Sequence, residues 1–206
     1  MRLLPNERDI VAKAREGDVA AFHDLYEAYR RPVFTFICRM TGSREDSEDL
    51  LQDVFVKAYR RLKSFRGDSD FSTWLFSIAK NETISFLRRH RRRNGKDVGL
   101  EEVHGAENAG CWTAEADDPE AEILSRETEA VFQRALASLP ANYRAAFILG
   151  VVEGLPYEEV GRILSCTVPN IKSRIFRARA RLARWIAQNY PEFGRQRTPA
   201  ARDRTR

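Results

Sequence analysis

Residues 171–186 place apolar and basic side chains at helical spacing, and this pattern restricts the local fold more than any other part of the chain. The apolar stripe consists of Ile171, Ile175, Ala178, Leu182 and Trp185. The opposite face carries Lys172, Ser173, Phe176, Arg177 and Ala180, flanked by Arg174, Arg179, Arg181 and Arg184. A helix that packs on a core by one face and offers unpaired cations on the other is suited to a DNA groove. The alternative is an ordinary solvated helix, although such helices usually mix charges of both signs.

The segment before this helix has the pattern of a helix-turn-helix motif. A short amphipathic helix is predicted over 157–164, and a turn follows at 165–168. Thr167 is placed to cap the next helix, and Pro169 falls in its first turn, where a missing N–H costs nothing. Gly161 lies inside the first helix, where we expect a loss of about 1 kcal/mol of helix propensity and no functional effect.

Length and charge limit the classes of protein to which the chain can belong. It has 206 residues and a formal net charge of +5, which fits one or two small domains and favours an anionic partner. No apolar run approaches the length of a membrane span, and residues 1–10 lack the hydrophobic core of a signal peptide. We therefore expect a cytoplasmic protein with no direct membrane insertion.

Metal binding and catalysis have no signature in the sequence. Cys38, Cys111 and Cys166 are far apart and form no Cys-x-x-Cys pair, which argues against a zinc site and a disulfide framework. Cys38 and Cys166 lie among apolar neighbours and are expected to be small core residues. The chain has no Walker loop, no carboxylate–His cluster and no nucleophile with a paired base. We expect no metal, no cofactor and no catalytic residue.

Helical periodicity occurs in two blocks, and neither shows the alternation of a strand. The sequence therefore predicts an all-α protein of two small helical domains, 1–93 and 121–190. Helices of the first block are predicted at 7–15, 19–30, 33–41, 44–62 and 71–93, with Pro32 opening the third and Ser43 capping the fourth. The intervening residues 94–120 are rich in glycine and carboxylates and predict a flexible acidic linker, while 191–206 predict a basic disordered tail.

The helix predicted at 44–62 has an acidic exposed face. Its buried stripe is predicted to be Leu51, Val54, Phe55, Ala58, Tyr59 and Leu62. Glu45, Glu48, Asp49, Gln52 and Asp53 gather on the other side. Such a face is usually just solvated, but in a basic protein it is also a reasonable docking surface for a basic protein partner. Spacing leaves both interpretations open.

Aromatic side chains and cations are interleaved from Phe65 to Arg93. The set consists of Phe65, Phe71, Trp74, Phe76 and Phe86 with Arg66, Lys80, Asn81, Arg88, Arg89 and Arg91–Arg93. Bases stack on rings while cations hold phosphates, so this composition favours single-stranded nucleic acid. Core packing is the alternative, and it fits Phe71, Leu75, Ile78 and Ala79, which share one helix face.

Three motifs, in order, make residues 7–188 resemble the extracytoplasmic-function (group IV) sigma factors of bacterial RNA polymerase, within the sigma-70 superfamily. SREDSEDLLQDVFVKAYRRLKSF at 43–65 is similar to region 2.2 of that family. FRGDSDFSTWLFSIAKNETISFLRR at 65–89 is similar to regions 2.3 and 2.4. LPANYRAAFILGVVEGLPYEEVGRILSCTVPNIKSRIFRARARL at 139–182 is similar to region 4. Nothing resembles the extra N-terminal region or the middle domain of housekeeping sigma factors.

The resemblance implies roles for the ambiguous patches. Asp49, Gln52 and Asp53 would bind the clamp coiled coil of core polymerase. A loop and helix carrying Phe65, Arg66, Asp68, Lys80, Asn81, Arg88 and Arg89 would read the minus-ten promoter element, partly by holding an unstacked base of the non-template strand. Lys172, Ser173, Phe176 and Arg177 would face the major groove of the minus-thirty-five element, and Asn170, Arg174 and Arg179 would contact phosphates.

The resemblance also implies an alternative sigma factor that directs promoter-specific initiation, is a monomer when free and is often held inactive by an anti-sigma factor. A stand-alone helix-turn-helix regulator is the main alternative, and it leaves the first block unexplained. The acidic linker, including Glu115, Asp117 and Asp118, is expected to follow a positively charged path through polymerase. An enzyme acting on nucleic acid is the third possibility, and the sequence contains none of the catalytic motifs that such an enzyme would need.

Overall fold

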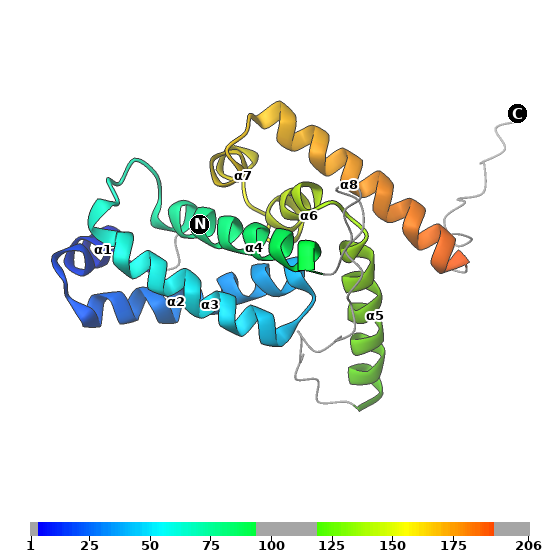
Figure 1. The fold of residues 1–206 in the computed structure, drawn as a ribbon, viewed down its shortest axis with the longest axis horizontal. Coiled ribbons are helices and arrows are strands. Elements are labelled where there is room, and N and C mark those ends of the chain that lie inside the picture. Colours follow the sequence, from blue (N-terminus) through cyan, green and yellow to red (C-terminus); the bar gives the residue numbers. More distant parts are fainter. Residues whose placement is uncertain (1–3, 94–118, 192–206) are drawn as a thin grey trace, which may run out of the picture.

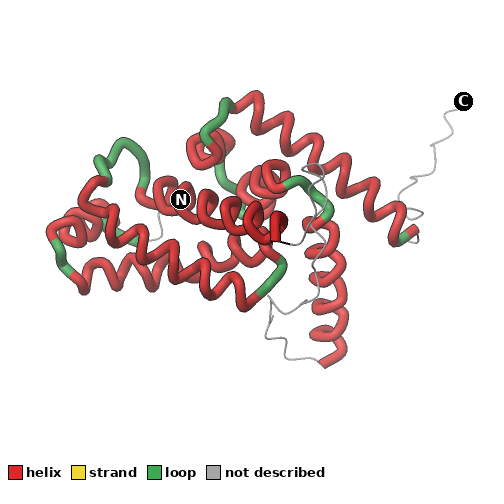
Figure 2. Tube along the Cα trace, in the orientation of Figure 1, coloured by secondary structure: helices red, strands yellow, loops and turns green. Residues whose placement is uncertain are grey.

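The computed structural model describes residues 4–93 and 119–191, and each regular element in these ranges is a helix (Figure 2). The predicted all-α fold class is therefore confirmed. Most of the predicted acidic linker, at 94–118, and the predicted basic tail, at 192–206, lie outside the described residues. The expectations for those two segments stay predictions.

The first block contains α1 (Glu7–Glu16), α2 (Val19–Thr41), α3 (Arg44–Arg61), the 3₁₀ turn η1 (Leu62–Ser64) and α4 (Phe71–Arg93). Local capping fixes where these helices begin. The Asp18 carboxylate accepts hydrogen bonds from the backbone N–H groups of Ala20 and Ala21 at 2.9 and 3.1 Å. The Ser43 hydroxyl accepts one from Asp46 at 3.3 Å, as the sequence predicts for the start of α3.

The predicted break at Pro32 is wrong, because α2 continues through this proline as one helix of 23 residues. A proline inside a helix removes one backbone hydrogen bond and crowds the preceding turn. Leu25, Tyr29, Val33 and Phe36, on both sides of it, are fully buried in the core. This continuous apolar face stabilises the helix more than the local defect destabilises it.

The second block contains α5 (Pro119–Ala137), α6 (Ala141–Phe147), the π-helical turn η2 (Ile148–Val152), α7 (Tyr157–Leu164) and α8 (Val168–Asn189). Helices α7 and α8 form the predicted helix-turn-helix. Thr167 is at the N-cap position, although its hydroxyl makes no capping hydrogen bond. A Cβ at Gly161 would lie 2.7 Å from the Cys166 carbonyl oxygen, so this glycine allows the turn to pass close to α7.

The two blocks pack against each other in the described structure (Figure 1). Helix α7 lies on α4, while α5 and α6 contact α2. One contiguous core therefore includes side chains of both blocks, from Val11 on α1 to Leu182 on α8. This packing brings surfaces that are distant in sequence close together.

Cys38 is fully buried, as expected for a small core residue, and Cys166 is a partly exposed free thiol. Within residues 4–93 and 119–191, no His, Cys, Asp and Glu side chains are grouped as a metal site would require. None of the helices in the same ranges combines the length and apolar character needed to cross a membrane.

Candidate docking and nucleic-acid interfaces

Helix α8 packs as the sequence predicts. Ile171, Ile175, Ala178 and Leu182 are buried, and Trp185 is partly buried against the same core. The opposite face is exposed at Lys172, Ser173, Phe176 and Arg177. Phe176 is 74% exposed, so its phenyl ring is available for contact with a partner surface. Asn170 and Arg179 are exposed beside this face, and Arg174 is partly covered.

Tyr143 on α6 holds two of the α8 arginines in place. The Arg177 Nη1 donates a hydrogen bond to the Tyr143 hydroxyl at 3.4 Å. The Arg181 guanidinium lies 5.7 Å from the centre of the Tyr143 ring, within cation–π range. Arg177 also lines two hollows of about 610 and 480 Å³, whose other walls come from α6, α8 and the turn before α6. Sequence reasoning missed Tyr143, because nothing in its local pattern shows that α6 lies beside α8.

The acidic face of α3 is exposed at Asp49, Gln52 and Asp53. Beside it, Val56 and Tyr59 are each 48% exposed, although Tyr59 was predicted to be buried. The Tyr59 ring makes an edge-to-face contact with Phe22 of α2, with ring centres 4.9 Å apart, so only one side of it is covered. The face therefore combines carboxylates with apolar area, as protein interfaces commonly do.

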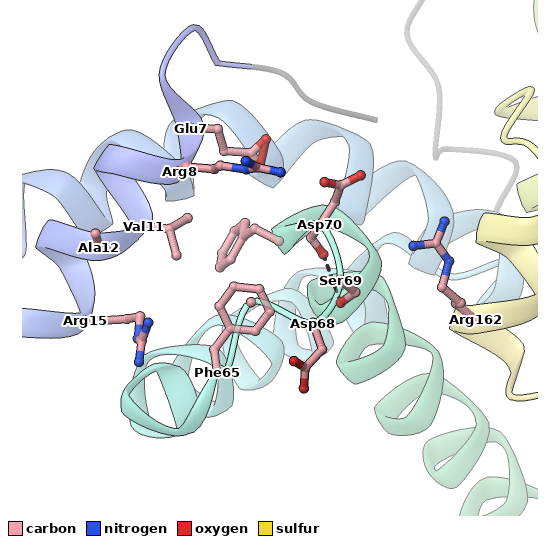
Figure 3. Close-up of a pocket in the computed structure, with 12 residues that line it drawn as sticks. Glu7, Arg8, Val11, Ala12, Arg15, Phe65, Asp68, Ser69, Asp70 and Arg162 are labelled. Carbon is pink, nitrogen blue, oxygen red and sulfur yellow. Dashed lines mark hydrogen bonds between the residues drawn. The ribbon is translucent and has the colours of Figure 1, made fainter.

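A cavity of about 330 Å³ lies between α1 and the loop that precedes α4 (Figure 3). Val11 and Ala12 line it from α1, and Phe65 and Phe71 supply aromatic rings. Charged side chains of both signs complete the lining: Arg8, Arg15 and Arg162, with Glu7, Asp68 and Asp70. Aromatic rings with cations and hydrogen-bond acceptors around them are suited to an unstacked base and its phosphate.

Phe65 is held in a cluster of three rings. Its ring centre lies 5.1 Å from that of Trp74 and 6.1 Å from that of Phe71. The side chain is only 7% exposed, yet it lines the cavity. Core packing and the predicted role in base binding are therefore compatible for Phe65, since one side of the ring packs and another faces the cavity. Arg66 and Asp68 are exposed on the same loop.

The predicted minus-ten residues on α4 differ in exposure. Asn81, Arg88 and Arg89 are exposed, but Lys80 is half-buried where α4 meets the turn between α7 and α8. The Lys80 ammonium donates a hydrogen bond to the Asn81 side-chain oxygen at 2.8 Å. Burial lowers the pKa of Lys80; the nearby Cys166 opposes this shift and the Arg174 charge adds to it. Lys80 and Arg174, predicted for different promoter elements, are thus neighbours.

Arg8 and Arg15 border the cavity and are not among the predicted site residues. These arginines are seven residues apart and therefore share one face of α1, a spacing that could have singled them out. Arg162 was not predicted either, because its place at the cavity depends on the packing of α7 against α4.

Two family models match this chain in the order that the structure displays. Sigma-70 region 2 matches residues 25–93, and Sigma-70 region 4 matches residues 129–182. The first range begins inside α2 and ends with α4, and the second begins in the second half of α5 and ends inside α8.

Curated relatives narrow the family further. An ECF RNA polymerase sigma-E factor of Escherichia coli strain K12 is 40% identical over 171 residues, which are 82% of this chain and 88% of the relative. A protein of the same description from Haemophilus influenzae is 37% identical over 173 residues, 84% of this chain and 91% of the relative. The chain belongs to the ECF sigma factors of the sigma-70 family.

Solved structures agree with this assignment. The sigma factor RpoE of Bartonella quintana, in complex with the anti-sigma factor NepR, superposes with a TM-score of 0.60. It is 28% identical, and the match covers 83% of this chain and 99% of that one. CnrH, in complex with the cytosolic domain of CnrY, has a TM-score of 0.65 at 24% identity, covering 89% of this chain and 98% of that one, and supports the fold alone.

Proposed function

We propose that this chain is an alternative sigma factor that binds bacterial core RNA polymerase and directs promoter-specific initiation through the minus-ten and minus-thirty-five elements. The observation that carries the proposal is the combination of two different nucleic-acid surfaces on one chain. The exposed face of α8 suits duplex DNA, and the cavity beside α1 suits a single unstacked base. A stand-alone helix-turn-helix regulator would need only the first of these surfaces.

The face of α3 is the proposed contact with polymerase. Asp49 and Asp53 supply negative charge, and Gln52 supplies an amide. Val56 and Tyr59 supply apolar surface that is removed from water when the partner binds. The complementary partner is a basic surface with apolar side chains. On this proposal, the charged side chains orient polymerase on α3, and the two apolar side chains contribute much of the binding affinity.

The loop before α4 and the exposed side of α4 are proposed to read the minus-ten element after strand separation. Phe65 and Asp68, which line the cavity, would contact a base there, and Arg66 is exposed on the same loop. Asn81, with its hydrogen-bond partner Lys80, would lie near that base. Arg88 and Arg89 would hold backbone phosphates near the end of α4.

The exposed face of α8 is proposed to enter the major groove of the minus-thirty-five element. Lys172, Ser173, Phe176 and Arg177 are placed toward base edges, where an arginine can donate two hydrogen bonds to guanine. Asn170, Arg174 and Arg179 flank this face and would bind phosphates, which orient the helix without reading sequence.

The proposal also places the protein in the cytoplasm, as a monomer when free. The RpoE structure was solved with an anti-sigma factor, and by that likeness we propose an anti-sigma partner for this chain. No catalytic residue, metal or cofactor has a part in the mechanism, since binding and positioning of DNA on polymerase account for the activity.

Run-off transcription with purified bacterial core polymerase tests the proposal. Core with this chain should produce new transcripts from a genomic fragment library, and their upstream sequences should share two elements. If core neither binds the chain nor initiates, while the chain alone shifts specific duplexes, the regulator interpretation replaces this one.

A double variant identifies the docking face. Asp49→Ala with Asp53→Ala should abolish co-elution with core polymerase, because two carboxylates leave one interface. Asp9→Ala with Glu16→Ala is the matched control, since it removes the same charge from exposed positions on α1. Equal loss of binding in both double variants would show a general charge effect rather than a docking site on α3.

A further inference from the structure

Asn81 on α4 lies between two residues whose side chains are engaged in polar contacts. The Lys80 ammonium donates a hydrogen bond to the Asn81 side-chain oxygen at 2.8 Å. On the other side, the Glu82 carboxylate forms an ion pair with Lys57 of α3, and only 19% of the Glu82 side chain is exposed. Glu82 therefore takes part in the packing of α3 on α4, while Asn81 is exposed to solvent.

The contact with Lys80 fixes the orientation of the Asn81 amide. An ammonium group has three N–H donors and no lone pair, so the atom that it contacts must be an acceptor. In an asparagine amide only the oxygen accepts, because the nitrogen carries two hydrogens. If the nitrogen were turned toward Lys80, two donors would oppose each other. The amide is therefore held with its NH₂ group directed away from Lys80 and available to donate.

This hydrogen bond is formed within one helix. Lys80 and Asn81 are consecutive residues of α4, so the bond needs no side chain from another element. It is also charge-assisted, and such bonds are stronger than those between neutral groups. The orientation of the amide can therefore persist while α4 is bound to DNA, whatever the position of the second block.

Asn81 and Arg88 share one side of α4, and Lys80 does not. Asn81 and Arg88 are seven residues apart, which is about two helical turns or roughly 10 Å along the axis. A strand that follows this side of α4 would meet Arg88 with a phosphate and Asn81 with a base edge. Lys80 is about 100° around the helix from Asn81, so it flanks this path instead of lying on it.

We infer that Lys80 is a positioning residue: it orients the Asn81 amide so that Asn81 donates to a carbonyl oxygen of an unstacked base, and Lys80 itself does not bind DNA. The inference rests on the proposed function, because it specifies how the same minus-ten surface reads its strand. Adenine is the one DNA base without a carbonyl oxygen. An asparagine reads adenine by presenting its oxygen to N6 and its nitrogen to N7. With its oxygen turned toward Lys80, Asn81 should disfavour adenine and select a base that has a carbonyl oxygen.

A direct phosphate contact is the alternative role for Lys80. A lysine that binds a phosphate adds affinity for every sequence, and it increases the salt dependence of binding because counterions are released. A lysine that only orients Asn81 changes base preference and leaves the salt dependence unaltered. The two roles therefore differ in two measurable quantities.

Binding of promoter DNA by the complex of the full chain with core polymerase distinguishes these roles. The labelled duplexes have an unpaired minus-ten element and carry each of the four bases in turn at each position of its non-template strand. Fluorescence anisotropy gives Kd at several salt concentrations. Asn81→Ala identifies the position that Asn81 reads, because base preference disappears there. At that position the wild-type chain should disfavour adenine by about five- to tenfold, the effect of one lost hydrogen bond.

Lys80→Met keeps most of the side-chain length and removes the donor. It should reduce the discrimination against adenine to about twofold and leave the slope of log Kd against log salt unchanged. Lys80→Arg, which can also only donate, should retain the discrimination. The double variant K80M/N81A should bind no more weakly than N81A, because Lys80 acts through Asn81. Arg88→Met is the matched control: it removes one positive charge from the same helix, should weaken all sequences equally and should reduce the slope by about 0.7.

Several outcomes would overturn the inference and leave the proposed function intact. A reduced salt slope in Lys80→Met, or a further loss of affinity in the double variant, would show that Lys80 binds a phosphate. Full discrimination against adenine in Lys80→Met would show that Asn81 needs no positioning, and an Asn81→Ala variant with unaltered preferences would show that Asn81 reads no base. A wild-type complex without base preference at any minus-ten position would instead refute the proposed function.

Discussion

The face of α8 and the cavity beside α1 are both assigned to DNA, but the protein constructs them in different ways. The α8 face consists of consecutive turns of one helix, so the spacing of its residues determines which side chains are exposed together. The cavity has walls from α1, the loop at 65–71 and α7, and its shape depends on how these elements pack. A duplex groove accepts a single helix, whereas an unstacked base needs an enclosure.

This difference predicts different sensitivities to substitution. Changes on α8 should alter one base contact at a time, because neighbouring side chains there act separately. Substitutions around the cavity should abolish base binding as a whole, because the cavity holds one base and each wall contributes to its shape. The following variants test that contrast.

Ala12→Trp should have the largest effect. Ala12 is exposed and lines the cavity from α1, so an indole there fills the space proposed for a base without disturbing the core. Loss of one stacked base costs up to about 3 kcal/mol, or roughly 100-fold in open-complex formation by the chain with core polymerase. Permanganate reactivity of unpaired thymines measures this step.

The control for this variant is Ala187→Trp, at an exposed position near the end of α8 that none of the proposed surfaces uses. It should leave strand opening unchanged. Retention of full open-complex formation by Ala12→Trp would exclude the cavity as a base site and leave the exposed side of α4 as the minus-ten surface.

Arg177→Ala should cost about 1–3 kcal/mol and relax base preference at one position of the minus-thirty-five element. Arg174→Ala should weaken binding to all sequences about equally, because that residue is assigned to a phosphate. Binding of the polymerase complex to a set of single-base promoter variants distinguishes the two. The same loss of preference in both variants would mean that the reading face of α8 is wrongly oriented.

The sequence predicts most of this fold because its helices carry local signals. The caps at Ser43 and Gly17 and the buried stripe of α8 follow from residues near them in the chain. The continuous α2 through Pro32 could not be predicted in this way, since the stabilising contacts of Tyr29 and Val33 come from other helices.

The candidate sites also differ in whether local sequence or packing between helices determines them. The exposed positions of Asp49 and Arg177 follow from helical spacing. The exposure of Tyr59, the place of Arg162 at the cavity and the contact of Tyr143 with Arg177 depend on packing between elements that no local pattern specifies.

Gly161→Ala tests whether packing overrides propensity in the turn that supports α8. Propensity alone predicts a gain of about 1 kcal/mol in stability. The new Cβ would meet the Cys166 carbonyl oxygen at 2.7 Å, so we expect a loss of about 1–2 kcal/mol instead. Thermal denaturation gives the sign. Ala183→Gly, at an exposed position of α8, should show the ordinary cost of glycine in a helix.

Tyr143→Phe should have the smallest effect and refines the idea that α8 side chains act separately. It removes the hydroxyl that accepts from Arg177 at 3.4 Å and keeps the ring beneath Arg181. A hydrogen bond of this length at an exposed site contributes about 0.5 kcal/mol, so base preference at the Arg177 position should relax two- to threefold. The promoter variants used for Arg177→Ala provide the measurement. A loss as large as that of Arg177→Ala would show that Tyr143 fixes the arginine conformation, and α8 would then depend on packing as the cavity does.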